Sequence, residues 1–352
     1  MKKASRESLF RSSLYRPISG RVLFAGLVAF LSSVSFSGHA QGVNKIITTV
    51  SVGGYVGGIA ISPDSKRVYV STLGQGIYVI DTATNQVGAT QLAGGDGPQQ
   101  MVFTPKGKAL YIADSAVTPG DGMISVISDP AALPGAFSDI IPSLGDNPLA
   151  IAITKDGKMI YAPDFQSGLV TVIDTSGNQV LPVQLQAGNG PVGVAFTPDG
   201  KYAYIANYYD GTVTVIATTT QNVVATIGVG NYPENVVITP NGKQAYVTIS
   251  DGTVAVIATA TNTVTTSIPL VTSIDDYITG LQSAITPDGK YLYVPITYPA
   301  EVVEVSTHTN TVVGTITINS GALRFVAITP DGKLAYVAGY TGYVTVINIA
   351  GS

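Results

Sequence analysis

The sequence predicts an all-β protein, a seven-bladed β-propeller made of four-stranded antiparallel blades. A turn motif, typified by Thr197-Pro198-Asp199-Gly200-Lys201, occurs seven times, beginning at residues 62, 104, 154, 197, 239, 286 and 329. Each turn leads into a strand that contains a tyrosine, such as Tyr204. Successive turns lie 42 to 50 residues apart. A fixed period of this size indicates a repeat architecture.

Each repeat reads as four short strands. Proline presets φ in the turn, Asp or Asn follows, and glycine supplies the positive φ that closes it. In the fourth repeat, residues 192–196 precede the turn, 202–207 follow it, and 212–216 and 222–227 complete the unit. These segments are rich in Val, Ile, Thr and Tyr, as strands are. One such sheet cannot bury both its faces, but seven stacked radially can.

The blades follow one another along the chain, and the two ends share the last one. Residues 43–52 match a fourth strand, whereas the last repeat stops after its third strand at 343–348. We therefore expect the N-terminal strand to complete blade seven and close the ring. Residues 41–352 then form one propeller. Blade one spans about 57–92, blade two has a long inner loop and a Pro- and Ala-rich outer connection, blades three and four are regular, and blade five has a long exit loop at 271–283.

Residues 1–40 read as a secretory signal peptide. Six basic residues precede the apolar run 22–31, and small residues lead to Ala40, where we expect cleavage before Gln41. About ten apolar residues are too few to span a bilayer, which takes roughly twenty. We therefore expect export to the periplasm, the cell surface or the medium. Because the segment holds six bases and one acid, its removal takes the formal net charge from −4 to −9. An acidic protein is a poor partner for duplex nucleic acid.

Composition excludes several kinds of chemistry. The chain has no cysteine and no tryptophan, and its two histidines are His39 in the signal peptide and His308 in an outer turn. Disulfides, thiolate nucleophiles, histidine triads and multi-histidine metal sites are therefore excluded from the mature chain. We expect no cofactor, and we interpret the seven repeated tyrosines as packing residues because every blade carries one.

Charge separates by face. The turns between first and second strands and between third and fourth strands form what we term the turn face, which carries most lysines. The loops between second and third strands and between blades form the loop face. Against eleven acids, the loop face has one base, Arg324. It also collects tyrosines outside the strand pattern, which offer flat amphipathic surface. The candidate ligand-binding residues are Asp96, Asp146, Asp164, Tyr208, Tyr209, Asp210, Tyr232, Glu234, Asp275, Asp276, Tyr277, Tyr298 and Arg324. Solvated loop acids and ring-packing tyrosines would give the same pattern.

The repeats resemble the YVTN-repeat β-propeller proteins of bacteria and archaea. The resemblance covers residues 43–350 and rests on the turn, the tyrosine strand and third strands such as Val172-Ile173-Asp174-Thr175; Tyr204-Ile205-Ala206-Asn207 is the nearest copy of the family's letters. It implies an exported propeller, usually without a defined activity. Relatives by fold include lactonase-type propellers and a periplasmic propeller that binds DNA.

Three functions follow as hypotheses. The first is a non-enzymatic, monomeric binding or scaffold propeller whose loop face holds an envelope or extracellular protein, a peptide, a glycan or a cationic ligand. The second is a lactonase-like hydrolase, with Glu234 or Glu301 as general base, Arg324 polarising a carbonyl, and Ca²⁺ or Mg²⁺ on aspartates left open. The third is nucleic-acid binding through the lysines of the turn face.

The long exit loop of blade five is a separate candidate. It places Asp275, Asp276 and Tyr277 among apolar side chains, and long loops on rigid scaffolds often bind ligands. We expect this loop to act as a binding lid over the ring centre, the alternative being an apolar plug of the channel.

Overall fold

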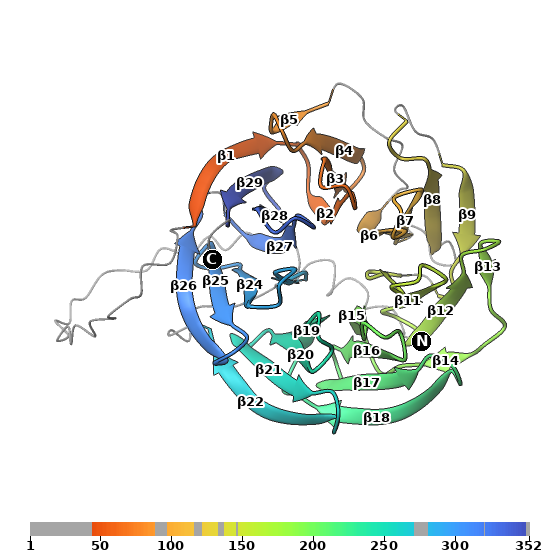
Figure 1. Cartoon of the computed structure of the whole chain (residues 1–352). Coiled ribbons are helices and arrows are strands. Elements are labelled where there is room, and N and C mark those ends of the chain that lie inside the picture. Colours follow the sequence, from red (N-terminus) through yellow and green to blue (C-terminus); the bar gives the residue numbers. More distant parts are fainter. Residues whose placement is uncertain are drawn as a thin grey trace, which may run out of the picture. The chain divides into compact units, whose positions relative to one another are not determined.

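The chain folds into a ring of seven antiparallel sheets, as the sequence predicts (Figure 1). The computed structural model describes residues 44–88, 97–115, 122–132, 137–145, 147–270, 281–319 and 321–349. The signal peptide predicted at 1–40 and the loop at 271–280 lie outside these residues. None of the described residues is in a helix that could span a membrane.

The strands run in chain order from the centre of each blade to its rim. Blades one to three contain β2 (Val56–Ile61), β3 (Arg67–Thr72), β4 (Gly76–Asp81) and β5 (Gln86–Val87); β6 (Pro98–Phe103), β7 (Ala109–Asp114), β8 (Met123–Ser128) and β9 (Asp139–Pro142); and β10 (Ala152–Ile153), β11 (Met159–Pro163), β12 (Leu169–Asp174), β13 (Gln179–Val180) and β14 (Leu185–Gln186). Blades four and five contain β15 (Pro191–Phe196), β16 (Tyr202–Asn207), β17 (Thr212–Ala217) and β18 (Asn222–Gly228); and β19 (Pro233–Ile238), β20 (Gln244–Ile249), β21 (Thr253–Ala258) and β22 (Thr263–Pro269). Blades six and seven contain β23 (Ala284–Ile285), β24 (Tyr291–Ile296), β25 (Glu301–Ser306) and β26 (Thr311–Thr317); and β27 (Leu323–Ile328), β28 (Leu334–Gly339) and β29 (Tyr343–Asn348), with β1 (Lys45–Ser51) as the outer strand.

The closing blade joins the two ends of the chain. β1 pairs antiparallel with β29, from Lys45 opposite Asn348 to Ser51 opposite Tyr343. This is the split blade predicted from the incomplete last repeat. It leaves blade seven with the same four strands as its neighbours.

The repeated turn holds itself together through its threonine. In blade four, the hydroxyl of Thr197 donates to Asp199 Oδ1 at 2.7 Å, and Gly200 N donates to Thr197 O at 2.8 Å with Gly200 at a φ of +69°. The threonine hydrogen bond is the main reason that the pKa of Asp199 lies below its ordinary value. The turn aspartates therefore serve the turn, as the sequence predicts.

The repeated tyrosines tie each blade to the next. All seven are buried, and in four of them the hydroxyl donates at 2.6 Å to the amide oxygen of a residue at positive φ in the next blade's outer turn; the pairs are Tyr111–Asn178, Tyr161–Gln221, Tyr204–Asn262 and Tyr246–Asn310. Tyr336 reaches Asn85 in the same way at 3.2 Å. These hydrogen bonds explain why tyrosine, and not phenylalanine, recurs. The apolar core lies between blades, where neighbouring sheets pack face to face.

Blade three departs from the regularity that the sequence predicts. Its outer strand is broken into β13 and β14, and its first strand β10 is only two residues long. Pro182 lies at the break and has no N–H to donate to a ladder. The exit from blade three is therefore less regular than that from blade four.

Candidate functional site

Two charged side chains occupy the same structural position in blades five and seven. The innermost strands β2, β15, β19 and β27 each carry a register shift at their loop-face end. In β19 the extra residue is Glu234, and in β27 it is Arg324. A bulge turns a side chain out of the regular alternation of a strand and is a common device near active sites. At the corresponding positions β2 and β15 have Gly57 and Val192, which carry no charge.

Glu234 is a buried carboxyl with one oxygen left without a partner. The side chain is 3% exposed. Ser250, which follows β20, donates its hydroxyl to Glu234 Oε1 at 2.7 Å, whereas Oε2 has no hydrogen-bond partner among the residues that the structure describes. Burial raises the pKa of Glu234 to about 7, against the opposing effects of the Arg324 charge and the Ser250 hydroxyl. A carboxyl with this pKa can both take up and release a proton near neutral pH.

Arg324 supplies a positive charge that acts on Glu234. The side chain is buried, and its guanidinium carbon lies 4.5 Å from the ring centre of Tyr340. Tyr340 in turn meets Tyr55 edge to face, with ring centres 6.1 Å apart. This cation–π contact holds the guanidinium beside the Tyr340 ring, and the charge is close enough to Glu234 to lower the pKa of that carboxyl.

Four aromatic side chains from blades three to five form a continuous row beside Glu234, which we call the aromatic shelf: Phe165, Tyr208, Tyr209 and Tyr232. Ring centres are 5.4 Å apart for Phe165 and Tyr209, 5.2 Å for Tyr208 and Tyr209, and 5.0 Å for Tyr208 and Tyr232. The charge of Glu234 contributes to the raised pKa of Tyr208, although burial is the larger cause. The shelf and the carboxyl therefore belong to one neighbourhood.

The remaining predicted residues lie in different surroundings. Asp164 is buried, and its carboxylate accepts hydrogen bonds from the backbone N–H of Asn147 and from Ser167 N and Oγ. Exposed Asp210 accepts a hydrogen bond from Asn189 N at 2.7 Å. Tyr298 is 64% exposed in the loop between β24 and β25. Asp96, Asp146, Asp275, Asp276 and Tyr277 lie outside the described residues.

Ser250 is the member of the neighbourhood that sequence reasoning missed. It lies one residue beyond β20, in a position that carries no repeated letter, so no sequence signal marks it. In the part of the chain that the structure describes, no group of three or more His, Asp or Glu side chains could hold a metal ion. The described residues thus offer acid–base and cationic groups here, but no ready metal site.

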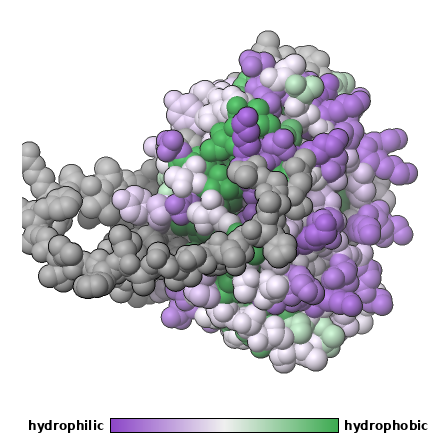
Figure 2. All heavy atoms as spheres, turned by 60° about the vertical axis from the view of Figure 1, so that its left-hand side comes forward, coloured by the Kyte–Doolittle hydropathy of each residue, from purple (hydrophilic) through white to green (hydrophobic). Residues whose placement is uncertain are grey.

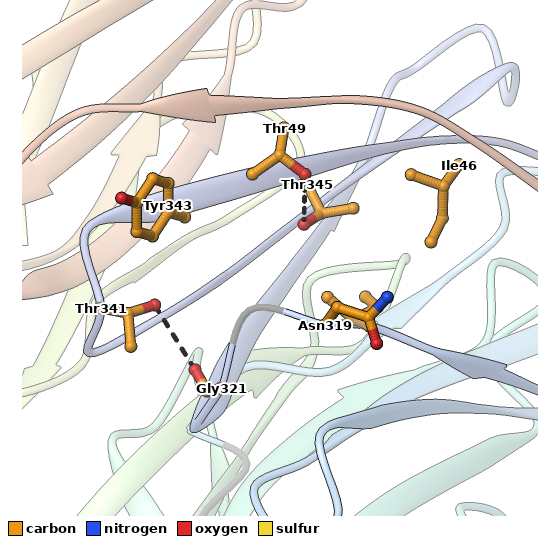
Figure 3. Close-up of a pocket in the computed structure, with 8 residues that line it drawn as sticks. Ile46, Thr49, Asn319, Gly321, Thr341, Tyr343 and Thr345 are labelled. Atoms are coloured by element: carbon orange, nitrogen blue, oxygen red, sulfur yellow. Dashed lines mark hydrogen bonds between the residues drawn. The ribbon is translucent and has the colours of Figure 1, made fainter.

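A cavity of about 510 Å³ lies elsewhere, at the seam between blades six and seven (Figure 3). Its wall includes Ile46, Thr49, Asn319, Thr341 and Tyr343. Figure 2 shows this side of the molecule, where apolar residues gather among hydrophilic ones. The lining contains no carboxylate and no base, so the cavity lacks the groups for acid–base chemistry. The Glu234 neighbourhood remains the candidate site.

The seven four- or five-stranded antiparallel sheets define a β-propeller of the seven-bladed class. The model of the family described as "Lactonase, 7-bladed beta-propeller" matches residues 49–192 and again 143–232. Together the matches cover 184 of the 352 residues, and the chain belongs to this family. Both matches end before Glu234 and Arg324. No curated protein matches the sequence.

Solved structures support the fold. The chain is similar to a chain of the hydrazine synthase of Kuenenia stuttgartiensis, with 24% identity and a TM-score of 0.74 over 90% of this chain and 100% of that one. It is also similar to the β-propeller domain of Cps50 (Swd1) from Myceliophteria thermophila, with 12% identity and a TM-score of 0.71 over 88% of this chain and 100% of that one. At these identities the likeness concerns the fold alone.

Proposed function

We propose that this protein is an exported hydrolase of lactones or similar cyclic esters, with Glu234 as general base and Arg324 as the group that polarises the carbonyl. The observation that carries the proposal is the buried Glu234 Oε2, which has no hydrogen-bond partner and belongs to a carboxyl with a pKa of about 7. A buried polar atom without a partner is costly, and such atoms occur where a site has a function to serve. Membership of the lactonase family supports the choice of substrate class.

The chemistry follows from the two groups. The ionised Glu234 takes a proton from a water molecule while the water oxygen attacks the carbonyl carbon of the lactone. The guanidinium of Arg324 stabilises the negative charge that forms on the carbonyl oxygen. The ring C–O bond then breaks, and the leaving alkoxide takes the proton from Glu234. One lactone and one water give one hydroxy acid, and the carboxylate is restored.

The test is a panel of lactones with wild type and Glu234→Gln between pH 5 and pH 9. We expect kcat/KM of the wild type to rise with pH and level off above about pH 7, because the base must be ionised. Glu234→Gln should lower kcat by roughly 100-fold or more, since general-base catalysis contributes about 10² to 10⁴. Glu304→Gln is the matched control, because Glu304 is equally buried but lies in the middle of β25. Hydrolysis that survives in Glu234→Gln would contradict the proposal.

A second candidate function is binding without chemistry. Tyr55, Tyr209, Tyr232 and Tyr298 are all at least 46% exposed on the loop face, which favours contact with a protein, peptide or glycan of the cell envelope. The resemblance to YVTN-repeat propellers supports export and this role. Recovery of partners from envelope extracts that is lost in a Tyr209→Ala, Tyr232→Ala, Tyr298→Ala variant, together with no lactone turnover, would favour binding over hydrolysis.

A further inference from the structure

The four rings of the aromatic shelf differ in exposure. Phe165 is buried and Tyr208 is half-buried, whereas Tyr209 is 50% and Tyr232 49% exposed. Neighbouring rings are tilted or edge to face, with interplanar angles of 49° for Phe165 and Tyr209, 84° for Tyr208 and Tyr209, and 39° for Tyr208 and Tyr232. The less exposed rings of Phe165 and Tyr208 pack against the exposed rings of Tyr209 and Tyr232. The shelf is therefore a supported aromatic surface and not a set of separate loop side chains.

Tyr209 is held by the loop beneath it. Gly190 has a φ of +65°, and a Cβ there would lie 2.6 Å from Tyr209 Cδ2, so the ring lies directly on the backbone. Tyr208 N donates to Gly190 O at 2.8 Å, and Tyr209 N donates to Asn189 O at 3.1 Å. The ring is thus held in place before any ligand arrives. A preorganised surface loses little conformational entropy on binding.

Tyr232 is connected to the proposed base. It adopts a φ of +62°, which is uncommon for a residue with a side chain and is found where the surrounding structure imposes it. Its carbonyl oxygen lies 3.1 Å from both the N and the Oγ of Ser250, and the same Oγ lies 2.7 Å from Glu234 Oε1. One serine therefore links the backbone of Tyr232 to the carboxyl of Glu234.

We propose that Tyr209 and Tyr232 form a subsite that binds an aryl ring on the non-reacting part of the substrate, next to Glu234. The inference rests on the proposed function and adds the substrate class, which is an aryl-fused or aryl-substituted lactone. An aryl ring prolongs the row of tilted rings already present. Aromatic rings that pack tilted or edge to face against each other gain more energy than a ring gains against a purely aliphatic surface.

The experiment compares dihydrocoumarin, in which a benzene ring is fused to the lactone, with δ-valerolactone, which has the same lactone ring alone. In Tyr209→Ala and Tyr232→Ala we expect KM for dihydrocoumarin to rise at least tenfold, with kcat changed less than threefold. KM for δ-valerolactone should stay within twofold of wild type. Tyr209→Phe keeps the ring and should keep the wild-type KM. Tyr343→Ala removes a tyrosine of similar exposure at the seam of blades six and seven and should change nothing.

Binding measured without turnover separates the two proposals. Calorimetry of dihydrocoumarin with Glu234→Gln should give an affinity that falls at least tenfold when Tyr232→Ala is added. If no lactone is hydrolysed but this ring-dependent binding persists, the hydrolase proposal fails and the subsite stands. If lactones are hydrolysed and KM for dihydrocoumarin is unaffected by either alanine variant, the subsite is wrong and the hydrolase stands. An equal loss with glucono-δ-lactone would contradict the choice of an aryl ring, and absence of both turnover and binding would overturn the subsite as well.

Discussion

Two buried glutamates, Glu234 in the candidate site and Glu304 at the seam between blades six and seven, differ in their hydrogen-bond partners. Glu234 is 3% and Glu304 4% exposed, and burial is the main reason that the pKa of each is raised. Glu304 Oε1 accepts a hydrogen bond from the hydroxyl of Tyr293 at 3.0 Å, and Oε2 accepts one from Asn44 Nδ2 at 2.9 Å. Glu234 accepts a hydrogen bond from Ser250 on one oxygen, and no described residue is a hydrogen-bond partner of the other.

The position of each residue explains the difference. The repeated tyrosine of the second strand faces a valine of the third strand in every blade except blade six, where Tyr293 faces Glu304; the valines are Val79, Val126, Val172, Val215, Val256 and Val346. In β26, the residue opposite Glu304 is Gly314, where a Cβ would lie 3.0 Å from the carboxylate. Glu304 thus has room and two partners in the seam where Asn44 begins the closing strand. A satisfied buried carboxyl serves the fold, and an unsatisfied one at a bulge is the better candidate for function.

The largest effect on stability that we expect comes from removing the carboxyl of Glu304, which has hydrogen-bond partners on both oxygens. Glu304→Ala removes the carboxylate that accepts hydrogen bonds from Tyr293 and Asn44 and opens a cavity between blades six and seven. We expect the free energy of unfolding to fall by about 3 kcal/mol. Urea denaturation measures this change, and Glu304→Gln, which keeps the shape and one carbonyl oxygen, should lose clearly less. An alanine variant as stable as wild type would show that the seam does not depend on this carboxyl.

The second prediction is that substituting Glu234 raises the free energy of unfolding, whereas substituting Glu304 lowers it. Its pKa is about 7 in the folded chain and ordinarily 4.5, so the fold favours the protonated form. The stability that this group contributes is complete below about pH 4.5 and is lost as pH rises through about 7. Glutamine cannot ionise. Glu234→Gln should therefore be more stable than wild type by about 2 kcal/mol at pH 8.

The difference between Glu234→Gln and wild type should disappear at about pH 4, because the carboxyl is then mostly neutral in both the folded and the unfolded chain. Urea denaturation at the two pH values is the measurement. Gain of stability together with loss of activity is the pattern expected of a functional residue. Equal stability of the two proteins at pH 8 would contradict the raised pKa and, with it, the contrast with Glu304.

The third prediction, with the smallest expected effect on stability, concerns a regular junction between two blades, in contrast to the seam between blades six and seven. Asn262 accepts the hydroxyl of Tyr204 at 2.6 Å and has a φ of +54°. Asn262→Ala removes the acceptor and strains the turn, and we expect a loss of about 1.5 kcal/mol. Asn262→Gly removes only the acceptor and should lose less, because glycine adopts positive φ freely. Thermal unfolding of the three proteins is sufficient, and equal melting temperatures would show that the tyrosine acts through packing alone.

The sequence by itself determined the blades and their number. The turn motif, such as Thr197-Pro198-Asp199-Gly200, spans about five residues, and the alternation of a strand spans about six. Both signals are local, so the sequence alone shows them. The incomplete last repeat and the extra strand at 43–52 likewise required the ends to share a blade. Arg324 could be named as a candidate because it is the one base of the loop face, and Glu234 because it is one of the acids that gather there.

Only the tertiary structure decided what surrounds each candidate. Asp164 and Glu234 look alike in the sequence, yet the backbone of Asn147 and Ser167 satisfies the first, while the second keeps a free oxygen beside Ser250. One of the two partners of Glu304, Asn44, lies 260 residues away along the chain. Burial and hydrogen-bond partners come from neighbouring blades and from the closed ring, because each blade presents its faces to the next. A local sequence pattern determines the backbone position of a side chain, and the packing of the ring determines which residues that side chain contacts.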